Sequence, residues 1–241
     1  MPVLTGGNYV MKIGIIGSGQ IGGALTRRLR AVGHEVAVAN SRGPASLAGL
    51  ADETGARATA LDEVVQGRDI LVFAITLHRF PELPANLLAA APAGLVVIDT
   101  SNYYPQQRDG RIGAIEDGQT ESGWVEQRLG RPVVKVFNSI LAQHLLEKGQ
   151  PAGMPGRIAL AISGDDPVTK ATVRHLVDEI GFDGVDAGGM EQSWRQQPGS
   201  PGYLKDGDVG SVRQTLADAS RERKPEWRAT PNSPGTFEQP A

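Results

Sequence analysis

The amino-acid sequence predicts an α/β fold: a doubly wound, mainly parallel sheet with helices on both faces and a small helical part on the carboxyl-terminal side. Three observations carry this prediction. Short runs rich in Val and Ile alternate with segments of helical periodicity through most of the chain. The runs are continuously apolar, which is typical of parallel strands covered on both faces. A glycine-rich segment at residues 17–22 joins the first run to the first helical segment.

Seven apolar runs are predicted to form the strands. They span residues 13–16, 35–39, 70–75, 95–99, 133–137, 158–162 and 184–187. Because strand and helix alternate from the first of these runs to the last, an open sheet with crossover helices is the expected architecture.

The first two helices are predicted from their end signals. One begins near Ile21 and stops at Gly33, because glycine readily adopts the left-handed conformation of a helix end. The next begins near Pro44, a favoured first helical residue, and stops at Gly55.

Later helices follow from similar signals. Pro81 and Pro84 delay the start of a helix expected within residues 80–91. A capping aspartate before a proline marks a helix over residues 166–180, and a last helix is expected over residues 209–223.

The spacing of Gly17, Gly19 and Gly22 is G-x-G-x-x-G between a predicted strand and a predicted helix. Gly17 permits the sharp turn, Gly19 lets a pyrophosphate approach the backbone, and Gly22 lets the helix pack closely on the sheet. The unpaired N–H groups of the first helical turn suit an anion. This context predicts a dinucleotide site of the Rossmann type, the alternative being a glycine-rich turn without a ligand.

The residues after the second strand favour one dinucleotide. A site for NAD usually has Asp or Glu there, whereas this chain has Asn40, Ser41 and Arg42. Arg42 can pair with a 2′-phosphate, and the other two side chains can donate hydrogen bonds to it. NADP(H) is therefore the predicted cofactor, the alternative being that Arg42 is a solvated surface residue.

Other candidate residues follow the next strands, at the edge where parallel strands of an open sheet bind ligands. The strand that ends at Ile75 is followed by Thr76 and His78, and Asn102 and Asn138 follow the two strands after it. These residues are predicted to line the nicotinamide end. The alternatives are that His78 caps a helix and points to water and that Asn102 forms a turn with its own backbone.

Composition and missing motifs exclude several classes of protein. The chain has 241 residues, with 24 Lys and Arg against 27 Asp and Glu and no Cys. There is no basic run typical of nucleic-acid binding, no apolar stretch long enough for a bilayer, and no signal-peptide pattern in the first eleven residues. The histidines lack metal-ligand spacing and no nucleophile elbow is present. A cytoplasmic protein without a metal is expected.

Several segments together resemble the NADP oxidoreductases that depend on the deazaflavin coenzyme F-420 and their bacterial relatives described as predicted dinucleotide-binding enzymes. The segments are residues 12–23, 40–42, 74–75, 99–105, 135–140, 181–183 and 193–199. The resemblance implies a Rossmann domain, often in a dimer, with a deazaflavin or flavin ring over the nicotinamide. It implies that NADP is bound by Ser18, Gly19, Gln20, Ile21, Ser41 and Arg42. Thr76 and Asn138 depart from the family pattern, so no deazaflavin contact is carried over.

The sequence predicts three parts: a dinucleotide-binding domain over residues 11–187, a loop and helix packing on it over 188–224, and a flexible tail over 225–241. The favoured function is hydride transfer between NADP(H) and a planar small-molecule acceptor, a deazaflavin, a flavin or a similar ring. The alternatives are a non-catalytic NADP(H) sensor and an ordinary dehydrogenase with His78 or His144 as proton relay.

Overall fold

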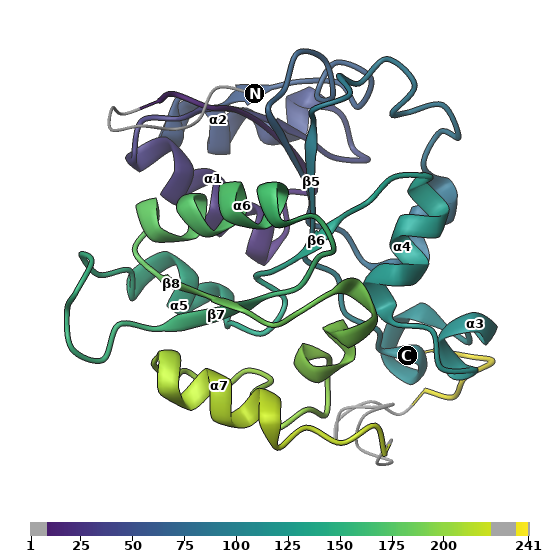
Figure 1. The fold of residues 1–241 in the computed structure, drawn as a ribbon. Coiled ribbons are helices and arrows are strands. Elements are labelled where there is room, and N and C mark those ends of the chain that lie inside the picture. The colour runs from purple at the N-terminus through teal and green to yellow at the C-terminus, as the bar shows by residue number, and fades with distance from the viewer. Residues whose placement is uncertain (1–8, 223–234, 241) are drawn as a thin grey trace.

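The computed structural model describes residues 9–222 and 235–240, and six parallel strands form its main sheet (Figure 1). Their order is β3-β2-β1-β4-β5-β6. The strands are β1 (Lys12–Ile16), β2 (Glu35–Ala39), β3 (Arg57–Ala58), β4 (Ile70–Phe73), β5 (Val96–Asp99) and β6 (Val134–Lys135). This confirms the predicted α/β class and the mainly parallel, Rossmann-type sheet.

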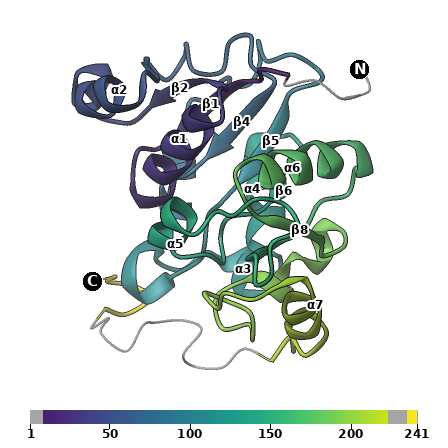
Figure 2. The ribbon, with the colours of Figure 1, turned by 90° about the vertical axis from the view of Figure 1, so that its left-hand side faces the viewer.

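Successive residues of the strands enter two different cores, because side chains alternate across a sheet. Ile13 and Ile15 of β1 pack in one core with α1 (Gln20–Ala31), α5 (Ala142–Glu147) and α6 (Pro167–Glu179). Leu71 and Phe73 of β4 pack in the other with α3 (Gly113–Glu116) and α4 (Glu121–Leu129). Helices therefore cover both faces, and Figure 2 shows α1 crossing in front of the sheet.

The last two strands lie in a sheet of their own, which differs from the single sheet that the sequence predicts. β7 (Ala159–Ile162) pairs in parallel only with β8 (Asp183–Asp186). One antiparallel bridge, between Lys135 and Ser163, connects this pair to β6. Phe137 adopts a left-handed φ of 65°, which turns the chain out of the strand direction soon after β6. The main sheet therefore stops at β6, and β7–β8 lies between α6 and α7 (Val209–Ala217) (Figure 1).

Several helices differ from their predicted bounds. The helix expected within residues 80–91 is instead a 3₁₀ helix over Leu77–Glu82, with Pro81 inside it. A proline has no N–H to donate, so no α-helix continues there. The last helix ends at Ala217 rather than near residue 223. The prediction also missed α4, although Thr120 caps it by accepting a hydrogen bond from the Gly123 N–H at 3.1 Å.

The division into three parts stays a prediction. Leu216 of α7 packs against β7 and β8, and residues 225–234 and 241 of the predicted tail lie outside the described residues. Residues 235–240 lie near α3, where the Arg111 guanidinium stands 4.5 Å from the centre of the Phe237 ring. No helix in the described ranges is long and apolar enough to span a lipid bilayer.

Candidate functional site

The glycine turn lies where the strand order reverses. β1 is flanked by β2 on one side and β4 on the other, and the chain reaches these neighbours in opposite directions. Beyond β1, the Gly17 N–H donates to the Ala39 carbonyl at 2.8 Å, and the Ala74 N–H donates to the Ile16 carbonyl at 2.8 Å. Ligands of open α/β sheets bind in the crevice formed at such a reversal.

The three glycines meet different surroundings. A Cβ on Gly17 would lie 2.2 Å from the Ala74 carbonyl oxygen at a φ of +109°, and one on Gly22 would lie 2.0 Å from the Gly17 carbonyl oxygen. A Cβ on Gly19 would meet nothing within 4 Å. Packing therefore requires glycine at the first and third positions. The middle position faces open space at the start of α1, where Gly19 is itself the N-cap residue and has no side chain to cap the helix.

A cavity of about 390 Å³ opens at this turn. Its walls come from β1, β2, β4 and the segments that follow them. The lining residues are Ile16, Gly17, Ser18, Gly19, Asn40, Ser41, Arg42, Leu61, Ala74, Ile75, Thr76, Arg79, Glu82 and Leu83. Eight of these were predicted from the sequence, and Gln20, Ile21 and Gly22 form the adjoining first turn of α1.

The end of β2 has no acidic side chain in the cavity wall. Asn40 donates to Ser18 Oγ at 2.9 Å, which ties β2 to the glycine turn, and its Oδ1 accepts from the Arg42 N–H at 2.9 Å. Within residues 9–222 and 235–240, the exposed guanidinium of Arg42 has no hydrogen-bond or ion-pair partner. Across the cavity Arg79 pairs with Glu82 at 2.8 Å. Arg42 is therefore available to an anion.

His78 is oriented by a buried carboxylate that the sequence did not reveal. Its Nδ1 lies 3.1 Å from Asp109 Oδ1, and its backbone N–H donates to the same oxygen at 3.2 Å. The Asp109 side chain is fully buried, whereas that of His78 is 30% exposed. The histidine neither lines the cavity nor projects freely into water.

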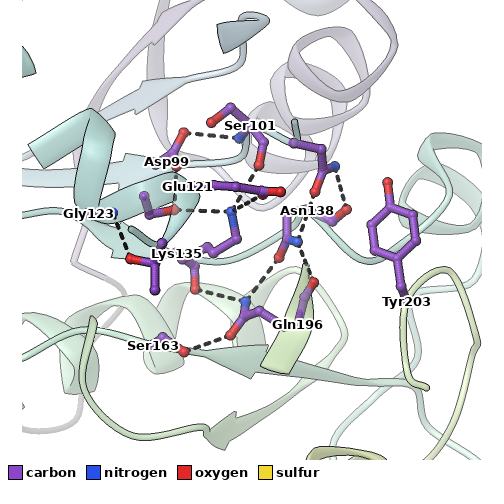
Figure 3. Close-up of polar contacts among 12 residues, drawn as sticks. Asp99, Ser101, Glu121, Gly123, Lys135, Asn138, Ser163, Gln196 and Tyr203 are labelled. Carbon is purple, nitrogen blue, oxygen red and sulfur yellow. Dashed lines mark hydrogen bonds and ion pairs between the residues drawn. The ribbon is translucent and has the colours of Figure 1, made fainter. Parts of the chain in front are cut away.

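Asn102 and Asn138 are brought together, as expected for residues that follow adjacent strands. The Asn138 amide donates to Asn102 Oδ1 at 3.1 Å and to the Gln196 carbonyl at 2.7 Å, and its Oδ1 accepts from the Gln196 amide at 2.9 Å. Figure 3 shows Asn138 beside Gln196, which also accepts from Ser163. Asn138 is only 3% exposed, so it supports Asn102 from behind. Neither residue lines the 390 Å³ cavity.

Two tyrosines join the segment after β5 to the carboxyl-terminal part. The hydroxyls of Tyr104 and Tyr203 lie 2.5 Å apart. Burial raises the pKa of both above the usual value, so both stay neutral. The neighbouring Tyr103 is fully buried and hydrogen-bonds to the Gly110 carbonyl at 3.1 Å, so it forms the wall of its own loop.

A buried charged cluster lies behind these residues. Lys135 and Glu121 are fully buried, with 3.3 Å between Lys135 Nζ and Glu121 Oε2. Burial raises the pKa of Glu121 to about 7, although the Lys135 ammonium opposes this rise. No group of acidic, histidine or cysteine side chains that could hold a metal ion occurs in the part of the chain that the structure describes.

Sequence reasoning missed the cavity residues Leu61 and Leu83 and the supporting residues Asp109 and Gln196. The two leucines carry no signal of their own, since apolar side chains in loops are usually core residues. Gln196 lies in a segment (193–199) that the resemblance singled out, so this segment could have indicated a role.

A comparison with known protein families gives a match to the amino-terminal part of the chain. The family model described as "NADP oxidoreductase coenzyme F420-dependent" matches residues 12–103, which hold β1 to β5 and the glycine turn. The predicted resemblance is confirmed over these residues. Because the family is named as an oxidoreductase that uses NADP, the match agrees with the predicted class of enzyme.

Two curated relatives match part of the chain. YjhV of Escherichia coli is 38% identical over 71 residues, which are 30% of this chain and 52% of YjhV. The metalloreductase STEAP3 of Rattus norvegicus is 29% identical over 180 residues, which are 74% of this chain and 34% of STEAP3. The chain therefore spans about half and about a third of the lengths of these relatives.

A solved structure agrees over most of the chain. The hypothetical protein SMa0349 from Sinorhizobium meliloti is 29% identical, and the comparison covers 82% of this chain and 95% of SMa0349 with a TM-score of 0.69. The similarity thus extends beyond residue 103 to the carboxyl-terminal part.

Proposed function

We propose that this chain, which matches the F420-dependent NADP oxidoreductases over residues 12–103, transfers hydride between NADP(H) and a planar small-molecule acceptor. One observation carries the choice of cofactor. The end of β2 presents Asn40, Ser41 and Arg42 to the cavity, where an NAD site would place a carboxylate.

The residues of the cavity fit the parts of this dinucleotide. The open space beside Gly19 and the uncapped start of α1 suit the pyrophosphate. Leu61 and Leu83 offer apolar surface to the adenine ring, and Arg42 offers a bidentate partner to the 2′-phosphate. When bound, NADPH supplies the hydride.

The acceptor is proposed to bind beyond Thr76, near Asn102 and Tyr104. Asn102 has an amide to orient the nicotinamide carboxamide, and the Tyr104 ring gives a flat apolar wall for a deazaflavin or flavin ring. The Arg108 guanidinium lies 5.4 Å from the centre of the Tyr104 ring and covers one face of this tyrosine. The role proposed for the chain is to align the two rings and to exclude water from between them.

Replacing Arg42 by Ala tests the cofactor assignment. We expect the affinity for NADPH to fall about 30-fold, because one charge-assisted bidentate contact of about 2 kcal/mol is lost. The affinity for NADH should stay the same, since NADH has no 2′-phosphate. Titration calorimetry measures both. Arg213→Ala on α7 is the matched control, and equal losses for NADPH and NADH would contradict the assignment.

The proposed activity is tested by mixing the protein with NADPH and a panel of acceptors: deazaflavin, FMN, riboflavin and quinones. Oxidation of NADPH by at least one of them is expected. Tight binding of NADPH without turnover would instead favour the NADP(H) sensor.

A second candidate, a dehydrogenase acting on a hydroxy acid or an imine, is favoured by the His78–Asp109 contact. In it, His78 would give a proton to the substrate heteroatom, and Asp109 would hold the imidazole ring in place. His78→Ala should then lower turnover about 100-fold without weakening NADPH binding. His175→Ala on α6 is the matched control, since His175 also lies beside a carboxylate, that of Glu179, at 3.6 Å. Unchanged turnover in His78→Ala would exclude this relay.

A further inference from the structure

The buried cluster around Lys135 and Glu121 fixes Ser101, in the segment that follows β5, through both its N–H and its carbonyl group. The Ser101 N–H donates to Asp99 Oδ1 at 3.0 Å, and the Ser101 carbonyl accepts from Lys135 Nζ at 3.0 Å. Figure 3 shows Lys135 reaching from β6 to Ser101 and Glu121. Ser101 directly precedes Asn102, so these two hydrogen bonds fix the backbone position from which the Asn102 side chain extends.

All three hydrogens of the Lys135 ammonium have an acceptor. Besides the Ser101 carbonyl, the acceptors are Glu121 Oε2 at 3.3 Å and Ser122 Oγ at 3.1 Å. Ser122 in turn donates to Asp99 Oδ2 at 2.5 Å. The cluster thus joins the start of α4 to the ends of β5 and β6.

The same two strand ends are joined a second time, through Asn102 and Asn138. Asn102 donates to the Asn138 carbonyl at 2.9 Å, and Asn138 follows Lys135 by three residues along the chain. Lys135 and Asn138 therefore hold Asn102 from both sides.

Joining two strands through a buried charged cluster is unfavourable in free energy. Removing lysine and carboxylate groups from water costs much free energy, and apolar side chains of similar volume often give equal or greater stability. Stability alone therefore does not account for a fully buried lysine at the end of β6. A need for fixed geometry at the strand ends accounts for the lysine, because one ammonium group sets the positions of several acceptors at once.

We propose that Lys135 and Glu121 are positioning residues that hold Asn102 for the nicotinamide half of the dinucleotide. This inference rests on the proposed function, since it takes the acceptor end of the site to be where that function puts it. It separates the site into two parts: the adenosine half depends on the glycine turn and Arg42, whereas the nicotinamide half depends on the buried cluster.

The test compares whole cofactor with a fragment. NADP⁺ and 2′,5′-ADP, which lacks the nicotinamide half, are titrated into the full chain by calorimetry. The main variant is K135M/E121Q, which removes both charges of the Lys135–Glu121 ion pair together and keeps side chains of similar volume. NADP⁺ should bind about tenfold more weakly, the loss typical of a removed supporting group, while 2′,5′-ADP binding should change less than about twofold.

A double-mutant cycle with Asn102→Ala separates positioning from a general loss of structure. In the wild type, Asn102→Ala should weaken NADP⁺ binding to a similar extent. In the K135M/E121Q background it should add almost nothing, because Asn102 is already displaced. Ser122→Ala, a milder change to the same cluster, should give a smaller effect of the same kind.

The other possible results of these titrations would contradict either the positioning role or the proposed function. Equal weakening of NADP⁺ and 2′,5′-ADP, additive effects with Asn102→Ala, or unchanged NADP⁺ binding would overturn the positioning role. Failure of the wild type to bind either compound would overturn the proposed function itself. The control K170M/D186N, which removes an exposed ion pair at 2.8 Å on α6 and β8, should bind both like the wild type.

Discussion

Gly19→Val should abolish useful binding of NADPH while leaving the protein folded. The new Cβ would meet no atom within 4 Å, and the backbone of Gly19 has an extended conformation that valine readily adopts. Its methyl groups would occupy the space proposed for the pyrophosphate, so the charge-assisted bonds to the start of α1 would be lost. We expect a loss of about 100-fold in affinity, or about 3 kcal/mol, measured by titration calorimetry.

Two other glycines provide the contrast. Gly22→Ala should destabilise the protein, because its Cβ would lie 2.0 Å from the Gly17 carbonyl oxygen. Gly49→Val, on α2 (Ala48–Thr54) and with open space around it, should change neither binding nor folding by much. A Gly19→Val protein that bound NADPH like the wild type would show that the pyrophosphate lies elsewhere.

Lys135→Met should lower the free energy of unfolding by about 3–5 kcal/mol at pH 8, the usual cost of removing one partner of a buried ion pair. The variant would leave Glu121 fully buried without its ammonium. The double variant K135M/E121Q should regain most of the loss, because the Glu121 carboxyl group is then replaced by a neutral amide. Urea unfolding measures both, and the exposed pair removed by Lys170→Met should cost less than about 1 kcal/mol.

The pH dependence of this effect follows from Glu121. Burial raises its pKa from 4.5 to about 7, so the folded protein takes up a proton between these values. The resulting stabilisation is fully present below pH 4.5 and is lost as pH rises through about 7. The wild type should therefore lose up to about 3 kcal/mol between pH 5 and pH 8.

Two variants check the origin of this slope. Glu121→Gln should flatten it, because an amide does not titrate. Lys135→Met should cost less at pH 5 than at pH 8, because the carboxyl is already neutral at the lower pH. A wild-type unfolding free energy that rises over this range would contradict the assignment to Glu121.

Among the described residues, every strand except β3, the glycine turn and the end of β2 could be predicted, because their signals are local. The two-residue strand β3 (Arg57–Ala58) has no apolar run and was not predicted. Apolar runs, glycine spacing and the Asn40-Ser41-Arg42 sequence each involve only a few neighbouring residues. Their effect on the backbone is therefore largely independent of where the segment lies in the fold. The prediction was wrong for residues 80–91, where Pro81 and Pro84 were expected only to delay an α-helix and the chain forms a 3₁₀ helix over Leu77–Glu82 instead.

The sequence by itself thus determined an α/β chain with a glycine turn and a basic end to its second strand. Only the tertiary structure decided that β7 and β8 leave the main sheet, that Asp109 orients His78 from 31 residues away, and that Gln196 holds Asn138 from 58 residues away. The reason is physical: these contacts form between segments that meet only after packing. A side chain's partners then depend on the crossing of helices and strands, which no short stretch of sequence encodes.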